Sequence, residues 1–195
     1  ADGCRLAAKG IHVSEEGGTN SLQIFAQSDG DVMGSLVSTA AGDAAGIGGE
    51  PGKTNGPITI FGGNVEAAGG VRGAGIGGGS GAAGQNITIH GGRITAKAYT
   101  AVFDSSEQGG DNRDDRGGGA VIGGGQGGDG KRITITGGTV HAEGTLVSSF
   151  DVDGRPAPSG PGGAGIGGGS GSGGTAITIL GGTVIATGSA AGAGI

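Results

Sequence analysis

Aromatic and sulfur-containing side chains are almost absent from this chain of 195 residues, which has four Phe, one Tyr, one Cys, one Met and no Trp. A core packed around large aromatic rings is therefore excluded, and small aliphatic residues must fill whatever interior exists. Cys4 is the only cysteine, so no disulfide bond can form within the chain, and we expect its thiol to be inert. The length suggests one domain.

Positive charge is also scarce, because 17 Asp and Glu outnumber 11 Lys and Arg, which gives a net charge of −6. Nucleic acids and anionic membranes attract basic surfaces, so neither is expected as a partner. No run of roughly 18 apolar residues occurs, and we therefore expect no membrane-spanning segment. The sequence begins at Ala1 without a signal-peptide core, which is expected after removal of a leader or in an excerpt of a longer protein.

Glycine, by contrast, contributes 55 residues, and these recur in a fixed pattern. The pattern is A-G-I-G-G followed by I-T-I-x-G-G-x-V-x-A. Its central isoleucines are spaced by 29, 46, 44 and 29 residues, at Ile47, Ile76, Ile122, Ile166 and Ile195. The second part starts 11 residues after the first four of them, at Ile58, Ile87, Ile133 and Ile177. The repeat is therefore about 29 residues long, and two repeats carry insertions of 17 and 15 residues.

Alternation within the repeat indicates short strands with one buried face. In Ile58-Thr59-Ile60 the isoleucines point to one side and the threonine to the other. Glycine pairs separate such strands and suit sharp corners. We therefore predict an all-β fold, a parallel β-helix (solenoid) with about 29 residues per turn and loop insertions on one flank. Residues 1–44 are expected to form an atypical first turn that caps the end, and residues 45–195 the regular repeats of the same domain.

Two exterior features of the predicted solenoid have alternative explanations. The strand around each A-G-I presents glycines outward, for example Gly75 and Gly77, and would be nearly bare backbone. Either neighbouring segments press close there, or this bare glycine face docks a partner or another copy. Similarly, one outward threonine per repeat forms a column, which we attribute to strand pairing rather than to ice binding.

The insertions are the expected binding region, because insertions at one place in successive turns emerge side by side. They cover roughly residues 99–118 and 145–162, and we predict a third excursion at Phe25–Asp43. Phe103 and Phe150 are expected to anchor the loops. We predict that a ligand is held by residues of this flank: Tyr99, Asp104, Asp111, Arg113, Asp151 and Arg155.

Acidic residues in the insertions suggest three alternatives. They form a solvated surface, or they bind calcium, because clustered carboxylates and loop carbonyls suit this ion. The candidate metal ligands are Asp114, Asp115 and Asp153. A pair of carboxylates for glycoside hydrolysis is the third alternative. No residue set compels an enzyme, which favours a non-catalytic protein and leaves an enzyme as the alternative.

The units at 133–140 (I-T-I-T-G-G-T-V) and 177–184 (I-T-I-L-G-G-T-V) resemble repeats of bacterial carbohydrate-binding β-helix proteins. Those proteins are secreted by anaerobes and bind plant polysaccharide and calcium. The units are also similar to Gly-rich repeats in large surface adhesins of gut Firmicutes. The resemblance covers residues 45–195 and implies a secreted or cell-surface bacterial protein that binds a polysaccharide or another glycan.

Three functions therefore remain open. The first is a binding module or adhesin that holds carbohydrate on the insertion flank. The second is a carbohydrate-active enzyme, a polysaccharide lyase or glycoside hydrolase, on the same fold. The third is a structural or assembly segment of a larger repeat protein, which would associate with itself through an open solenoid end or the bare glycine face.

Overall fold

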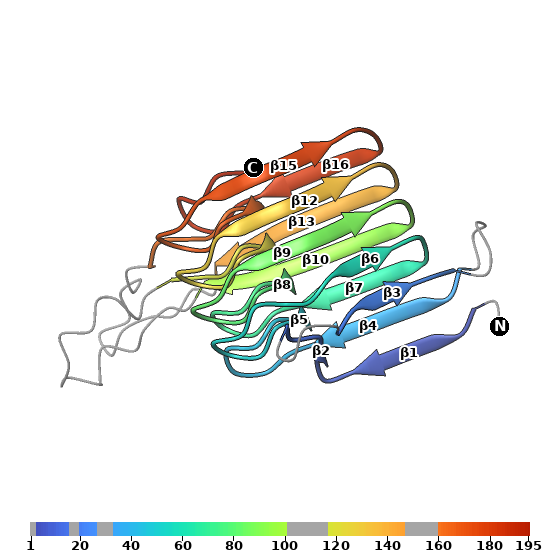
Figure 1. The fold of residues 1–195 in the computed structure, drawn as a ribbon, viewed down its shortest axis with the longest axis horizontal. Helices are drawn as coiled ribbons and strands as arrows, with labels where there is room; N and C mark the ends of the chain where they lie inside the picture. Colours follow the sequence, from blue (N-terminus) through green and yellow to red (C-terminus); the bar gives the residue numbers. More distant parts are fainter. Residues whose placement is uncertain (1–2, 16–19, 27–32, 101–116, 147–159) are drawn as a thin grey trace.

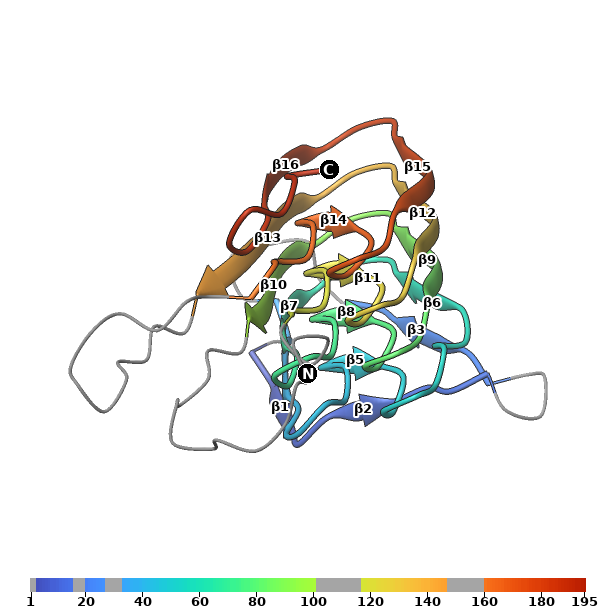
Figure 2. The ribbon, with the colours of Figure 1, turned by 90° about the vertical axis from the view of Figure 1, so that its left-hand side faces the viewer.

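The computed structural model describes residues 3–15, 20–26, 33–100, 117–146 and 160–195. These residues form an all-β structure of three parallel sheets, which confirms the predicted parallel β-helix (Figure 1). We call the sheets A, B and C. In Figure 2 they enclose a three-sided interior. The described part of the chain contains no helix capable of crossing a bilayer.

Each sheet collects one strand from every coil. Sheet A contains, in spatial order, β1 (Arg5–Ala8), β4 (Ser35–Thr39), β7 (Asn64–Ala68), β10 (Arg93–Thr100), β13 (Thr139–Leu146) and β16 (Thr183–Thr187). Sheet B contains β2 (Ile11–His12), β5 (Ile47–Gly48), β8 (Ile76–Gly77), β11 (Ile122–Gly123) and β14 (Ile166–Gly167). Sheet C contains β3 (Leu22–Ile24), β6 (Ile58–Ile60), β9 (Gly84–Ile89), β12 (Gly130–Ile135) and β15 (Gly174–Ile179).

The interior consists of columns of equivalent aliphatic side chains, as the alternation predicts. In sheet C, Ile58 pairs with Ile87 and Ile87 with Ile133, and all three side chains are fully buried. Sheet B contributes a second isoleucine column. Sheet A contributes a column of Val, Ile and Leu beside a column of Ala that also contains Ser38. Each coil therefore buries its inner face against the coils above and below it, in addition to the facing sheets.

The N-terminal region is more regular than the sequence indicates. Its strands occupy the same three sheets as the later coils, and β4 pairs with β1 on one side and β7 on the other. The prediction of one excursion over Phe25–Asp43 is therefore wrong, because Ser35–Thr39 within it is a regular strand of sheet A. In chain order, residues 26–33 connect β3 to β4, whereas the two insertions belong to the segments after β10 and β13.

The outward glycines of sheet B are buried, so a bare glycine face is not exposed to a partner. A Cβ atom on Gly75 would lie 2.7 Å from the carbonyl oxygens of Lys97 and Val121. A Cβ atom on Gly77 would overlap the carbonyl oxygen of Gly123 in the next coil. These glycines are therefore required by close backbone contact, which was the first of the two explanations, and we do not propose this face as a docking surface.

The side chain of Asn55, which precedes β6, makes hydrogen bonds of the kind that the strand backbones make with one another. Asn55 is fully buried; its Nδ2 donates to the carbonyl oxygens of Gln85 (2.7 Å) and Gly56 (2.8 Å), and its Oδ1 accepts from the Gln85 amide (2.9 Å). The side chain thereby joins two successive coils by the same kind of bonds that the strands make elsewhere.

We expect Asn55→Ala to lower the free energy of unfolding by about 1–3 kcal/mol, because the Gln85 amide and carbonyl would lose their partner inside the protein. Chemical denaturation would measure the change. Asn20→Ala is the matched control, since Asn20 is exposed and makes one long bond of 3.2 Å to the Ser14 carbonyl. Equal effects of the two substitutions would contradict a bridging role for Asn55.

Candidate functional site

Two strands of sheet A extend beyond their neighbours. β10 and β13 pair along eight positions, whereas the pairing of β10 with β7 ends at Lys97 and that of β13 with β16 ends at Glu143. The extension ends at the pair formed by Thr100 and Leu146, so the first two residues of each predicted insertion (99–118 and 145–162) belong to strands. The starting points of the two insertions are therefore neighbours, as the repeat pattern predicts.

The outer face of these two strands carries polar side chains in two parallel rows. Alternation turns Thr95, Lys97 and Tyr99 of β10 outward, because the intervening Ala96 and Ala98 are fully buried in the core. In β13 the corresponding outward residues are His141, Glu143 and Thr145, which pair with the β10 row position by position. The two rows place six polar side chains on one face next to both insertions.

Opposite charges connect the rows. The Nζ atom of Lys97 lies 3.5 Å from Oε2 of Glu143, and the two side chains are 43% and 59% exposed. Such an exposed ion pair adds little to stability, on the order of 0–1 kcal/mol. Both groups can therefore exchange their mutual contact for hydrogen bonds to a ligand at small cost.

A shallow groove continues this surface toward the N-terminal coils. It has a volume of about 180 Å³ and lies over β4, β7 and β10. Its lining includes the side chains of Thr39, Glu66, Thr95 and Lys97. The groove crosses the strands, so a bound chain would contact successive coils of the solenoid.

Of the residues predicted to hold a ligand, Tyr99 is the one that the structure describes. It is half-buried on the outer face of β10, one residue before the end of that strand. The other predicted ligand-binding residues lie outside the described residues: Asp104, Asp111, Arg113, Asp151 and Arg155. The same holds for the predicted metal ligands Asp114, Asp115 and Asp153, and for Phe103 and Phe150.

The acidic side chains of the described residues are dispersed or already engaged. No three of the His, Cys, Asp and Glu residues placed by the structure come together as a possible metal site. Asp129 is engaged by Lys131, whose Nζ lies 3.0 Å from its Oδ2, and by the Gly173 amide, which donates to its Oδ1 at 3.3 Å. The hydrogen bond and charge of Lys131, with the Gly173 bond, lower the pKa of the Asp129 carboxyl group. The predicted calcium ligands lie outside the described residues, so the calcium site stays a prediction.

Sequence reasoning missed Lys97 and Glu143, although the signal was available. The segments R-I-T-A-K-A-Y and T-V-H-A-E-G-T alternate in the same phase, so their outward residues could have been assigned to one face. The unusual length of β10 and β13 was not predictable in the same way, because the alternation continues into the insertions without a glycine pair to mark the end.

Comparison with known proteins adds no relative to this description. The chain matches no protein-family model, no curated protein and no solved structure. The fold thus defines the class, a parallel β-helix with a polar outer face on sheet A.

Proposed function

We propose that this protein is a non-catalytic glycan-binding module whose site lies on the outer face of sheet A, at the ends of β10 and β13. The observation that carries the proposal is the group formed by Tyr99, Lys97 and Glu143 at the point where both insertions begin. An aromatic ring beside charged hydrogen-bonding groups is suited to sugars, which present apolar ring faces and hydroxyl edges.

The spacing of the strands supports a ligand made of repeated units. Adjacent strands of a sheet lie about 4.8 Å apart, so equivalent side chains of successive coils form regularly spaced rows. Glu66, Thr95 and His141 are paired neighbours in one such row. A polysaccharide that crosses the strands would meet donors and acceptors at this interval, starting in the groove over β4 and β7.

The insertions would complete the site in this proposal. Asp104, Asp111, Arg113, Asp151 and Arg155 would add hydrogen bonds from the side of the strand ends, and Asp114, Asp115 and Asp153 would hold calcium if the ion is needed. A module of this kind would act outside a bacterial cell, in secreted form or on the surface, where polysaccharides are accessible. We assign no reaction to it.

Binding to a broad glycan array, with calcium and with a chelator, tests the proposal. We expect selective binding that Tyr99→Ala weakens at least tenfold, since a ring at the centre of a binding site commonly contributes more than about 1.4 kcal/mol. Tyr99→Phe should retain most of the affinity if the ring stacks on a sugar. Lys97→Ala should also weaken binding, while Thr134→Ala on the outer face of sheet C serves as the matched control.

The same experiment separates the strand face from the insertions. If Asp104→Ala and Asp151→Ala abolish binding and Tyr99→Ala does not, the site belongs to the insertions alone. A chelator that removes binding would support calcium ligands among the acidic residues. An array that stays silent with and without calcium would refute the glycan-binding module.

A further inference from the structure

A second groove lies at the corner where the chain passes from sheet C to sheet A. It has a volume of about 280 Å³ and extends over successive coils, because its lining includes Phe61, Gly91 and Thr139. None of the described residues that line it is acidic, and its one charged side chain belongs to Arg93. The groove therefore offers a locally positive surface on a chain whose net charge is −6.

Arg93 supplies this charge from the outer face of sheet A. It is the first residue of β10, and the alternation that buries Ile94 turns its side chain outward. Arg93 is exposed, and its guanidinium group makes no ion pair or hydrogen bond with another described residue. A guanidinium group presents its N–H donors in a planar fork that matches the two oxygens of a carboxylate. Arg93 can therefore bind a carboxylate without giving up an ion pair within the described part of the chain.

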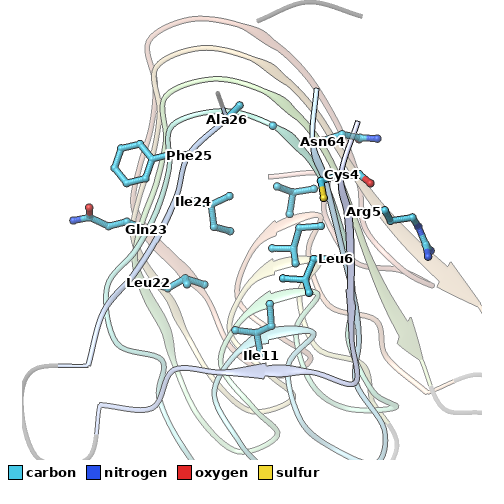
Figure 3. Close-up of a pocket in the computed structure, with 15 residues that line it drawn as sticks. Cys4, Arg5, Leu6, Ile11, Leu22, Gln23, Ile24, Phe25, Ala26 and Asn64 are labelled. Atoms are coloured by element: carbon cyan, nitrogen blue, oxygen red, sulfur yellow. The ribbon is translucent and has the colours of Figure 1, made fainter. Parts of the chain in front are cut away.

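Phe61 contributes a second positive element, the edge of an aromatic ring. Its ring stacks on Phe25, with centroids 4.5 Å apart, and on His90, with centroids 5.0 Å apart. These residues occupy equivalent positions of successive coils, and Figure 3 shows that Phe25 points outward from sheet C. Because both faces of the Phe61 ring are covered, the ring can present only its edge to the groove. The edge of an aromatic ring carries partial positive charge, which favours an anion over the apolar face of a sugar.

The backbone of the groove adds hydrogen-bond donors. Each regular coil makes this corner with a glycine pair, and Gly92 has a φ angle of +92°. The amides of Gly91 and Gly92 donate to no acceptor among the described residues, and the same holds for the pair at 137–138 in the next coil. At the corner between sheets A and B, by contrast, the Gly70 amide donates to the Ala44 carbonyl oxygen of the previous coil at 2.9 Å. Successive backbone amides in a turn conformation commonly form concave anion sites.

The polar groups of the groove suit an anion with a single charge. One guanidinium group balances the charge of one carboxylate, whereas a phosphate monoester carries about −1.5 to −2 at neutral pH. Thr139, which pairs with Arg93 in sheet A, adds a hydroxyl group as a further donor. The combination of one fork of donors, free amides and a ring edge therefore favours a carboxylate over a phosphate.

We propose that this corner groove is a carboxylate-binding site, in which Arg93 binds both carboxylate oxygens and the amides of Gly91 and Gly92 donate to them. The body of the ligand lies beside the edge of Phe61. The site is separate from the glycan-binding face at Tyr99, because Arg93 and Tyr99 are six residues apart on one extended strand, about 20 Å. It does not depend on the proposed function, since a free organic acid and an acidic sugar unit present the same group.

Amide NMR spectra of the full chain, recorded during titration with sodium glucuronate and in parallel with glucose, test the site. The two sugars share one ring and differ at one carbon, which is a carboxylate in glucuronate and a hydroxymethyl group in glucose. We expect glucuronate to shift the resonances of Gly91 and Gly92 in a saturable manner and glucose to leave them unchanged. Titration with sodium acetate distinguishes the two sources: equal affinity indicates a site for small organic acids, and a preference for glucuronate indicates a site for acidic sugars.

Substitutions of Arg93 provide the second test. Arg93→Ala is expected to weaken the binding of glucuronate about tenfold or more, because a charge-assisted pair is lost. Arg93→Lys should weaken it less, since an ammonium group keeps the charge but not the planar fork. Arg132→Ala is the matched control, because Arg132 donates to Oδ1 of Asn86 on sheet C, outside the groove, and Ala176 occupies the equivalent position of the next coil. This variant should bind glucuronate like the unmodified chain.

Three results would overturn the carboxylate site. The first is an equal response of Gly91 and Gly92 to glucose and glucuronate. The second is an Arg93→Ala variant that binds glucuronate as tightly as Arg132→Ala does. The third is inorganic phosphate that binds more tightly than glucuronate, which would indicate a general anion site. A silent glycan array would refute the glycan-binding face at Tyr99 and leave these three comparisons unaffected, so the two proposals fail separately.

Discussion

Replacing Gly77 by alanine is expected to lower the free energy of unfolding by about 4 kcal/mol or more, among the largest effects of any single substitution. Gly77 is buried in sheet B and has a φ angle of +138°, a backbone conformation that L residues rarely adopt. The added Cβ atom would overlap the carbonyl oxygen of Gly123 in the next coil. Because backbone atoms on both sides are held by ladder hydrogen bonds, relief of the overlap requires the two coils to separate.

A residue of the same column provides the matched control. Gly167 has nearly the same φ angle, +146°, but a Cβ atom there would meet the Ala164 Cβ at 3.3 Å and no closer atom. Gly167→Ala should therefore cost only the strain of the backbone conformation, about 1–3 kcal/mol. The difference between the two variants measures the contact between successive coils.

Urea denaturation of both variants, followed by circular dichroism, gives the comparison. If Gly77→Ala and Gly167→Ala are destabilised equally, conformational strain alone explains the glycines and the close approach of the coils contributes nothing. If neither variant is destabilised, the backbone of sheet B can shift to accommodate the added methyl group without loss of stability. We expect a large decrease in the free energy of unfolding for Gly77→Ala and a smaller decrease for Gly167→Ala.

The sequence predicted the fold because its repeats encode both strands and corners. Alternation in Ile58-Thr59-Ile60 assigns the buried side, and the structure buries both isoleucines fully. The glycine face was harder to interpret, because a glycine column looks the same in sequence when it is exposed and when it is pressed against a neighbouring backbone. Only the positions of Lys97 and Val121 around Gly75 distinguish these cases.

The N-terminal coils and the candidate site were less accessible to sequence reasoning. β4 has the sequence Ser-Leu-Val-Ser-Thr, which lacks the I-T-I and G-G signals, and it becomes a regular strand through pairing with β1 and β7. Tyr99 was predicted from its place near an insertion, whereas Lys97 and Glu143 gain their relation from the pairing of two strands that are distant in sequence. Neighbours in adjacent coils can be identified only when the register between the strands is known. The insertions between these strands make that register difficult to read from the sequence.

Truncating a central isoleucine is the second substitution with a large expected effect. Ile87 is fully buried in the sheet C column between Ile58 and Ile133. We expect Ile87→Ala to lower the free energy of unfolding by about 2–5 kcal/mol, through lost transfer free energy and the cavity left behind. Coils on both sides are held in register by their own hydrogen bonds, so collapse around the cavity is limited and the upper part of this range is expected.

Ile177 occupies the same column in the last coil, where it is only partly buried and has β12 on one side. Ile177→Ala should therefore cost less than half as much as Ile87→Ala, because part of its surface already contacts water and the vacated space is open to solvent. Thermal unfolding monitored by calorimetry would compare the two. Equal losses of stability would contradict the partial burial of Ile177.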